Sequence, residues 1–511
     1  ESILFADLPE EARHMRGEYT LLYDGQGAIR VTGRASRIRA EAGRIRFHYS
    51  PGPGIVGVAI SALDPDDPIR NIRVVKTDHL PLFEAGEIFN PDWLPLVQDV
   101  RVLRFMTWMM TNSSTLSEWD DRPRVSDATW SEDGVPHEVM IELANRIGVD
   151  PWFTLPHLAT DDYIRNFARA VHDGLDPGLI AYVEYSNEVW NWIFPQAHWA
   201  RDRAQEMWGD AGDGWVQYYA LRAAQAMDIW TEVYGDDAPD RLIRVVATHT
   251  GWMGLEDSIL RAPLAMLTLG RQPQESFDAY AVTGYFGHEW GGAEMMPRLN
   301  ALLDRAEAEA AKAGSALGLR RVALREYVQQ HRFDSAVDIV TEELRAGSVA
   351  DLVNEVFPYH AQVAREAGLQ LVMYEGGNHV AARDEMVDDA RLTAFFSHHA
   401  YTRGMASLYA SVLQGWVAAG GTLFNAFVDV APTSRWGNWG ALRHLSDDNP
   451  RWDILQRFNA TAPTDWQPRD PAVFRNGVSA MAGAEGGALE GSARNDVLAG
   501  GPGRDRLVTR G

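Results

Sequence analysis

The sequence of 511 residues predicts an α/β protein, in which a (β/α)8 barrel follows an antiparallel β unit and precedes a glycine-rich tail. Seven short apolar runs that do not alternate with polar residues are separated by helical patterns, as is typical of buried parallel strands. The length of this region also suits a barrel of eight strands. A doubly wound sheet is the structural alternative, but no run is followed by a glycine-rich phosphate turn.

The region from about Gly17 to Val75 has a different texture. Its short runs alternate between apolar and polar residues and are separated by Gly and Pro, which predicts antiparallel strands in a small sandwich or in a sheet packed against the next domain. We therefore expect a terminal segment at 1–16, the β unit at 17–77, the barrel at 78–460, and a linker with repeats at 461–511.

Seven apolar runs supply the expected barrel strands: 100–105, 151–155, 180–185, 242–248, 279–285, 369–374 and 422–427. A less clear run near 69–75 completes the eight as the first strand. With this numbering, 180–185 is the fourth strand and 369–374 is the seventh.

Composition excludes several classes of protein. Lys plus Arg is 47 and Asp plus Glu is 71, so the net charge of −24 disfavours nucleic acid or an anionic membrane as the partner. The absence of cysteine excludes disulfides, thiolate metal sites and a cysteine nucleophile. No apolar run is long enough to span a membrane, and the first residues lack a signal-peptide pattern. The 18 tryptophans fit either a large core or a cleft lined with aromatic rings.

The tail carries a repeat. Residues 500–507 read Gly-Gly-Pro-Gly-Arg-Asp-Arg-Leu, and 486–498 are a degenerate copy of the same pattern. The tail resembles the RTX repeats of bacterial secreted proteins. That resemblance implies Ca²⁺ bound by Asp carboxylates and turn carbonyls, and type I export to the cell exterior. Two copies are too few to close a roll, so we expect the tail to be unfolded.

Two glutamates follow apolar runs at the positions where barrel active sites lie. The fourth run leads into Ser186-Asn187-Glu188, and the seventh leads into Tyr374-Glu375-Gly376-Gly377. Cleavage of a glycosidic bond needs two carboxyl groups, one to protonate the leaving oxygen and one that is ionised.

These motifs and their strand order make the region 90–460 similar to the clan A glycoside hydrolases, the retaining 4/7 superfamily. The resemblance implies that Glu188 is the acid/base, Glu375 the nucleophile, and Asn187 a ligand of the sugar 2-hydroxyl. It also implies that Tyr285 bonds the nucleophile and that Trp436 or Trp439 forms a floor under the reacting sugar. Familiar members of the clan read Asn-Glu-Pro, whereas Val189 follows Glu188 here, which indicates a divergent family.

Alternatives remain for two charged residues. Glu326 is a rival nucleophile if 322–327 is the seventh strand; we prefer Glu375, because a clear helix precedes its run and Gly376-Gly377 leaves room for a ligand. Arg104 either bonds the nucleophile, as an Arg often does in this clan, or forms a buried ion pair in the barrel. Glu184 lies deeper in the fourth run and is expected to be a structural charge.

Further strand-end residues are predicted to bind substrate: Arg104, Trp108, Asn112, His157, Trp190, His249 and Asn378. Trp192, Trp252 and Trp290 also lie near barrel loops, although any single tryptophan is more often a packing residue. His157, His249, His288 and His379 follow four different strands and raise the alternative of a metal-dependent hydrolase. No His-x-His occurs, so we expect neither a metal nor another cofactor in catalysis.

The sequence thus predicts a secreted, retaining glycosidase that acts on a β-linked polysaccharide or oligosaccharide. A β-glucan is the first expectation, followed by mannan, galactan or another exopolysaccharide. The rivals are a non-catalytic carbohydrate-binding barrel, a metal-dependent hydrolase and a structural adhesin. The oligomeric state is not predicted.

Overall fold

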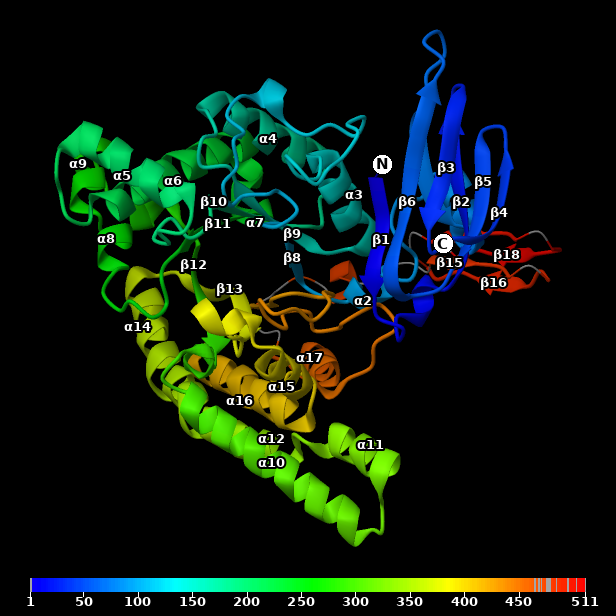
Figure 1. Cartoon of the computed structure of the whole chain (residues 1–511). Helices are drawn as coiled ribbons and strands as arrows, with labels where there is room; N and C mark the ends of the chain where they lie inside the picture. Colours follow the sequence, from blue (N-terminus) through cyan, green and yellow to red (C-terminus); the bar gives the residue numbers. More distant parts are fainter. Residues whose placement is uncertain are drawn as a thin grey trace. The chain divides into compact units, whose positions relative to one another are not determined.

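The computed structural model describes residues 2–463, 466, 469, 471–474, 479–483, 485–493, 496–501 and 503–510. The chain divides into two compact units (Figure 1). One unit comprises Glu1–Gln98, Leu442–Asp448 and Arg475–Gly511, and the other comprises Asp99–Ala441 and Asn449–Phe474.

The N-terminal part of the first unit contains two antiparallel sheets. Their strands are β1 (Ser2–Leu8), β2 (Gly17–Asp24), β3 (Gly27–Gly33), β4 (Ser36–Glu41), β5 (Arg44–Tyr49), β6 (Gly52–Leu63) and β7 (Arg70–Lys76). The sheet orders are β1-β6-β3 and β4-β5-β2-β7. Every second side chain of β5 is buried, and these join apolar residues from β2, β3 and β6 in one core. The core therefore takes side chains from both sheets, which is the packing of a small β-sandwich. Two short helices follow, α1 (Leu80–Glu84) and α2 (Leu94–Val97).

The second unit is built on a parallel sheet. In the described residues it has seven strands in chain order: β8 (Val102–Arg104), β9 (Asp150–Leu155), β10 (Ala181–Tyr185), β11 (Leu242–Ala247), β12 (Ala279–Phe286), β13 (Gln370–Asn378) and β14 (Phe424–Ala426). The two edge strands, β8 and β14, contact each other, so the sheet is nearly closed into a barrel. All seven predicted runs are confirmed as parallel strands. Every residue of β9 and β10 is buried, which explains why these runs do not alternate.

The predicted eighth strand is wrong. Residues 69–75 were expected to form the first strand of the barrel. Instead, Arg70–Lys76 forms β7, which pairs antiparallel with β2 in the N-terminal sheet. The strand before Glu188 is therefore the third of the sheet, and the strand before Glu375 is the sixth. The two glutamates remain three strands apart, as the predicted numbering has them.

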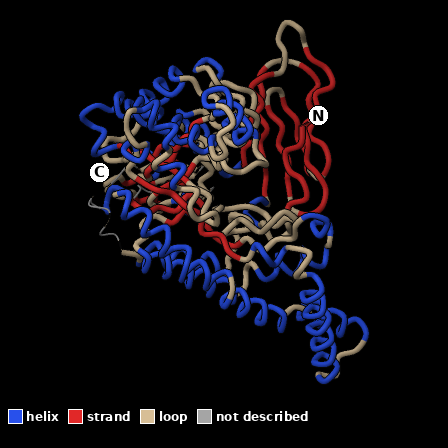
Figure 2. The backbone as a smooth tube through the Cα atoms, turned by 90° about the vertical axis from the view of Figure 1, so that its left-hand side faces the viewer, coloured by secondary structure: helices blue, strands red, loops and turns tan. Residues whose placement is uncertain are grey.

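Helices lie outside the parallel strands (Figure 2). They are α3 (His137–Ile147), α4 (Asp161–Gly174), α5 (Pro195–Trp208), α6 (Gly214–Tyr234), α7 (Ala238–Arg241), α8 (Asp257–Leu260), α9 (Pro263–Leu269), α10 (Met296–Ala316), α11 (Arg321–His331), α12 (Asp334–Ala346), α13 (Ser348–Asp351), α14 (Phe357–Ala367), α15 (Ala390–His399), α16 (Arg403–Ala419) and α17 (Pro450–Thr461). A π-helical turn at Leu352–Val356 joins α13 to α14. Between β12 and β13, α10 to α12 form a helical projection (Figure 1).

The described part of the tail is not unfolded, contrary to the sequence prediction. It contains β15 (Ser479–Met481), β16 (Ala488–Glu490), β17 (Val497–Ala499) and β18 (Arg506–Val508). β15 pairs in parallel with β17, and β16 with β18. These strands begin nine residues apart, and each pairs with the strand that begins eighteen residues away.

Candidate active site

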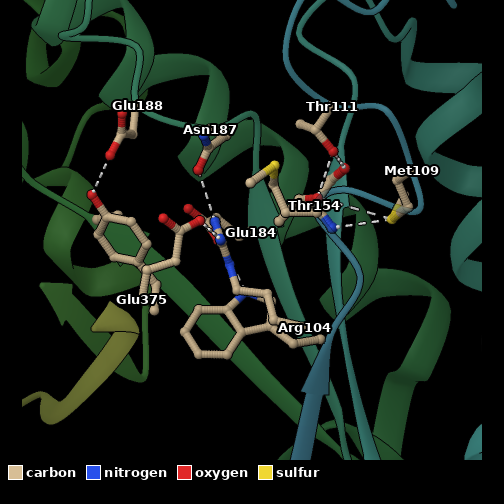
Figure 3. Close-up of polar contacts among 12 residues, drawn as sticks. Arg104, Met109, Thr111, Thr154, Glu184, Asn187, Glu188 and Glu375 are labelled. Atoms are coloured by element: carbon tan, nitrogen blue, oxygen red, sulfur yellow. Dashed lines mark hydrogen bonds and ion pairs between the residues drawn. The ribbon is translucent and has the colours of Figure 1, made fainter. Parts of the chain in front are cut away.

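Charged and polar side chains from three strands meet at the carboxyl ends of the parallel sheet (Figure 3). Arg104 ends β8, Glu184 lies in β10 with Glu188 just beyond it, and Glu375 lies in β13. Carboxyl ends of parallel strands meet on one face of a barrel, so residues far apart in sequence become neighbours. All of these residues belong to the second unit.

Arg104 links the carboxylates. Its side chain is 5% exposed; Nη1 donates to Glu375 Oε1 at 2.8 Å, and Nη2 donates to Glu184 Oε2 at 2.8 Å and to Asn187 Oδ1 at 2.9 Å. Both contacts considered for Arg104 in the sequence analysis are therefore present: the bond to Glu375 and a buried ion pair with Glu184. Burial alone would lower the pKa of Arg104, but the carboxylates of Glu184 and Glu375 raise it, so the guanidinium stays charged.

Glu184 is a buried structural charge. Besides Arg104, it accepts a hydrogen bond from Trp152 Nε1 at 3.0 Å. Burial raises the pKa of Glu184, whereas the bonds from Arg104 and Trp152 lower it. The role of this carboxylate is to hold Arg104 in place beside Glu375.

Glu375 is buried and held at both oxygens. Oε1 accepts from Arg104, and Oε2 accepts from the hydroxyl of Tyr285 at 2.9 Å. Burial raises the pKa of Glu375 to about 7; Arg104 and Tyr285 oppose this shift, and the nearby charge of Glu188 adds to it. The hydrogen bonds fix the orientation of a carboxylate that loses its proton near neutral pH.

A β-bulge in β13 adds a residue to the site. Met373 pairs with Val282 and Glu375 pairs with Thr283, so Tyr374 is an extra residue in the ladder. A bulge of this kind breaks the regular alternation of side chains between the two faces of a strand. The Tyr374 hydroxyl donates to Glu188 Oε1 at 3.0 Å, while the next residue, Glu375, bonds Arg104 and Tyr285. The residue that precedes Glu375 in the strand thus bonds the other carboxyl group of the pair, Glu188.

Glu188 stands on an unusual backbone. Its φ is +43° and that of Ser186 is +62°, both in the left-handed region that non-glycine residues rarely adopt. Such strain persists where the surroundings enforce it, and it concentrates at functional sites. Glu188 Oε2 accepts from Asn191 Nδ2 at 3.0 Å, so each of its oxygens has one donor. Glu188 is more exposed than Glu375, as suits a group that exchanges protons with a substrate or water.

An amide network positions Asn187. Its Oδ1 accepts from Arg104, and its Nδ2 donates to Asn112 Oδ1 at 3.0 Å. Gln196, fully buried on α5, donates to Asn112 Oδ1 at 2.8 Å and to the Asn187 carbonyl at 2.9 Å. Thr111 next to Asn112 bonds Thr154 of β9 at 2.6 Å (Figure 3). Asn112 therefore helps to orient Asn187, and its predicted contact with substrate stays a prediction.

Aromatic rings surround Tyr285. The Trp439 ring lies 5.9 Å from the Tyr285 ring, and the His379 ring is next to both, 5.4 Å from Tyr285 and 4.9 Å from Trp439. Of the two floor candidates, Trp439 is thus the one in this cluster. Trp436 is 63% exposed and stacks under Arg435, with 4.9 Å from the guanidinium carbon to the ring.

Other predicted substrate contacts lie in varied surroundings. Trp190 is buried and packs edge-on against Tyr219. Trp108 packs against Phe105. Asn378 is buried and caps its own turn through a bond from Val380 N.

The four strand-end histidines lie in different surroundings. His249 is exposed, and His157 is buried against Trp199, with burial lowering its pKa to about 4. His288 and His379 are neighbours, at 4.8 Å between rings, and His288 bonds Arg383. Within the described ranges, no three or more His, Asp or Glu side chains are grouped to hold a metal ion. The same residues include no helix whose length and hydropathy would let it span a membrane.

The structure shows where the rival nucleophile Glu326 lies and what surrounds the glycines after Glu375. Glu326 lies exposed in α11, outside the parallel sheet, so it does not end a strand. The glycines after Glu375 lie against interior side chains. A Cβ on Gly376 would lie 2.5 Å from Met373 Sδ, and one on Gly377 would lie 2.5 Å from the Tyr409 hydroxyl. Both positions need glycine because the interior packs against them.

Sequence reasoning assigned no role to Tyr374, Asn191 or Gln196. The contact of Tyr374 with Glu188 could not be predicted from the alternation of side chains along a strand, because the bulge interrupts that alternation. Asn191 had a local signal, because it stands three residues after Glu188 in a turn where side chains can fold back. Gln196 lies on a helix, and nothing in its neighbourhood in the sequence points to the strand ends.

Comparison with known proteins gives distant structural matches. No protein-family model and no curated protein matches the sequence. An endo-β-1,4-mannanase structure from Thermotoga petrophila is 11% identical, with 74% of this chain and 73% of that chain covered and a TM-score of 0.34. A hyperthermostable endo-1,4-β-D-mannanase from Thermotoga petrophila RKU-1, with maltose and glycerol, is 11% identical, with 72% and 93% covered and a TM-score of 0.32. Similarity at this level leaves the function to be argued from the side chains of the site.

Proposed function

We propose that the protein is a retaining glycoside hydrolase that cleaves a β-linked polysaccharide. The observation that carries the proposal is the pair Glu188 and Glu375, two carboxyl groups on strands three apart with different surroundings. Glu375 is buried and fixed by Arg104 and Tyr285, and Glu188 is more exposed and bonded by Tyr374 and Asn191. Environments that differ in this way separate the roles of two carboxyl groups.

The reaction proceeds in two displacements. Ionised Glu375 attacks the anomeric carbon, and the bond from that carbon to the leaving oxygen breaks while Glu188 gives its proton to this oxygen. A glycosyl ester on Glu375 results. Glu188, now a carboxylate, takes a proton from water, and the water oxygen displaces Glu375 and restores the free enzyme. Arg104 and Tyr285 stabilise the Glu375 carboxylate each time it carries its full charge.

A β-glucan is the first substrate candidate, with mannan and galactan next, and we propose that the enzyme acts outside the cell. The tail strands, paired two repeats apart, support an RTX-like repeat that takes Ca²⁺. Asp505 accepts from Gly487 N at 2.9 Å and from Gly501 N at 2.8 Å, so its carboxylate lies where two turns meet. Asp496 and Asp505 with turn carbonyls would supply the oxygen ligands that Ca²⁺ prefers.

The experiment is a panel of soluble polysaccharides with product detection, run on the wild type, Glu188→Gln, Glu375→Gln and Glu326→Gln. We expect one glycan to be cut, both site variants to lose activity, and Glu326→Gln to retain it because Glu326 is exposed on α11. Full activity in Glu375→Gln, or the absence of cleavage across the panel, contradicts the proposal. Binding without cleavage would favour a non-catalytic carbohydrate-binding barrel.

A further inference from the structure

Three tryptophans form a strip whose first member, Trp192, follows the residue that bonds Glu188. The rings of Trp192 and Trp215 lie 5.2 Å apart, and those of Trp215 and Trp252 lie 6.2 Å apart, with planes tilted by 44° and 43°. Trp192 follows β10, Trp215 lies in the first turn of α6, and Trp252 follows β11. We call these three residues the tryptophan strip; their side chains are adjacent because β10 and β11 are neighbours in the sheet.

The strip is exposed to solvent. Trp192 is 43% exposed and Trp252 is 49% exposed, and each is followed by another exposed apolar residue, Ile193 at 84% and Met253 at 43%. Contiguous apolar surface of this kind is uncommon on soluble proteins and marks a place where something binds. Trp190, two residues before the strip, shows the contrast, because it is buried in ordinary packing.

Hydrogen bonds connect the turn that carries Trp192 to the carboxyl group of Glu188. Asn191, the residue before Trp192, donates to Glu188 Oε2 and accepts from Ile193 N at 3.1 Å. The carbonyl of Trp192 bonds His198 Nε2 at 2.9 Å. Asn191, which bonds Glu188, thus holds the backbone turn from which the Trp192 side chain extends.

Hydrogen bonds fix the turns that carry Trp252 and Trp215. Gly254 N donates to both oxygens of Glu256, at 3.1 and 2.9 Å, and the Tyr359 hydroxyl also bonds Glu256, which is 3% exposed. Ser258 bonds Asp213, which lies two residues before Trp215. The rings are thus exposed while the turns that carry them are anchored, which lowers the ordering cost of binding.

The chemistry of the strip fits a neutral glycan chain. The apolar faces of pyranose rings stack on indole rings, and the 5.2 and 6.2 Å ring spacings are similar to the length of one sugar residue in an extended chain. The net charge of −24 and the carboxylates of Asp213 and Glu256, which bond the turns near Trp215 and Trp252, disfavour an anionic chain.

The side on which the strip lies gives it a specific role. The acid/base protonates the leaving oxygen, so the departing part of the substrate lies on the Glu188 side of the scissile bond. We infer that the tryptophan strip binds two or more sugar residues on the leaving-group side, so that the enzyme acts on polymers and longer oligosaccharides in preference to short glycosides. This inference rests on the proposed glycosidase function.

Binding and turnover are measured separately, so that the strip and the proposed function are tested independently. For binding, full-length Glu375→Gln and the double variants that add Trp192→Ala, Trp252→Ala or Leu267→Ala are compared by affinity electrophoresis in soluble β-glucan and β-mannan. Leu267 is 77% exposed on α9, so Leu267→Ala is a control that removes exposed apolar surface away from the tryptophan strip. We expect each tryptophan change to weaken binding about tenfold, equivalent to about 1.4 kcal/mol, and Leu267→Ala to leave it unchanged. Thermal unfolding confirms that the variants fold, and Trp192→Phe should restore most of the binding.

For turnover, kcat/KM is measured with oligosaccharides of increasing length and with an aryl β-glycoside. The tryptophan variants should lose activity on the longer chains and keep it on the aryl glycoside, whose leaving group is too short to span the strip. Tryptophan variants that bind and cut long chains as the parent does overturn the inference, as does the absence of glycan binding by Glu375→Gln. Strip-dependent binding in a wild type that cuts nothing contradicts the proposed function and leaves glycan recognition by the strip supported.

Discussion

Replacement of Tyr374 by Phe removes one hydroxyl group and keeps the buried ring against Arg104, whose guanidinium carbon lies 5.0 Å from the ring centroid. The change deletes the 3.0 Å bond from Tyr374 to Glu188 Oε1. A hydrogen bond to a charged group contributes about 1.5–3 kcal/mol, which corresponds to about a 10- to 150-fold change in rate. Asn191 still holds the other oxygen of Glu188, and water can reach this half-exposed carboxyl group. We therefore expect the lower end, a loss of about tenfold in kcat/KM.

The choice of substrate separates a role in acid catalysis from a general loss of structure. A polysaccharide has a poor leaving group and needs the proton of Glu188, whereas a dinitrophenyl glycoside leaves without it. Since kcat/KM reports on the first displacement, Tyr374→Phe should lose about tenfold on the polysaccharide and less than about twofold on the aryl glycoside.

Tyr280→Phe is the matched control, because Tyr280 is a buried strand tyrosine whose hydroxyl bonds His360 at 2.8 Å, away from the carboxylates. It should leave the ratio of the two kcat/KM values unchanged. An unaltered polysaccharide kcat/KM in Tyr374→Phe, or equal losses on both substrates, would refute the assignment of Tyr374 to Glu188.

Three further predictions follow from the same site and from the tail. Because the proposed nucleophile Glu375 must be ionised and its pKa is raised to about 7, kcat/KM for a dinitrophenyl glycoside, which does not need the proton of Glu188, should rise with pH through about 7. In Glu188→Gln the charge that helps to raise the pKa of Glu375 is gone, so the midpoint measured with the same substrate should move to lower pH, and an unmoved midpoint would contradict this. Arg104→Met leaves the buried Glu184 carboxylate without its partner and should lower the free energy of unfolding, measured by urea denaturation, by about 3–5 kcal/mol. Adding Glu184→Gln should recover part of this loss. A double variant that is no more stable than Arg104→Met argues against a structural ion pair. Ca²⁺ should increase the thermal stability of the tail in the full chain, chelation should reverse the increase, and Asp505→Ala should abolish it; equal calcium responses in wild type and Asp505→Ala would exclude Asp505 as a ligand.

Burial explains which parts of the fold the sequence predicts. Strands such as β9 and β10 are covered on both faces, so their composition alone marks them as parallel strands. Residues 69–75 have a similar apolar content, yet they pair with β2 in an antiparallel sheet. Local composition indicates that a segment is a strand and does not specify the sheet it joins. In the tail, pairing across two repeats was enough to order strands that isolated copies would not form.

The site shows the same division between local and long-range information. Glu188, Glu375 and Tyr285 come from motifs at strand ends, and the barrel brings their side chains together. Tyr374 was missed because a bulge changes the direction of side chains in a way that alternation does not reveal. Arg104 was left with two interpretations because one guanidinium reaches two carboxylates, and only the folded chain shows that Glu184 and Glu375 lie on either side of it.

The roles of Glu188 and Glu375 are tested most directly by rescue with azide, a small anion that enters the space left by a deleted carboxylate. With an aryl β-glycoside, Glu188→Ala should still form the glycosyl ester on Glu375, and azide should release a β-glycosyl azide. Glu375→Ala has no nucleophile, so azide should attack from the opposite face and give the α-glycosyl azide. NMR of the two products distinguishes the anomers. Opposite anomers from the two variants are the predicted result, and the same anomer from both would contradict the assignment of Glu375 as nucleophile and Glu188 as acid/base.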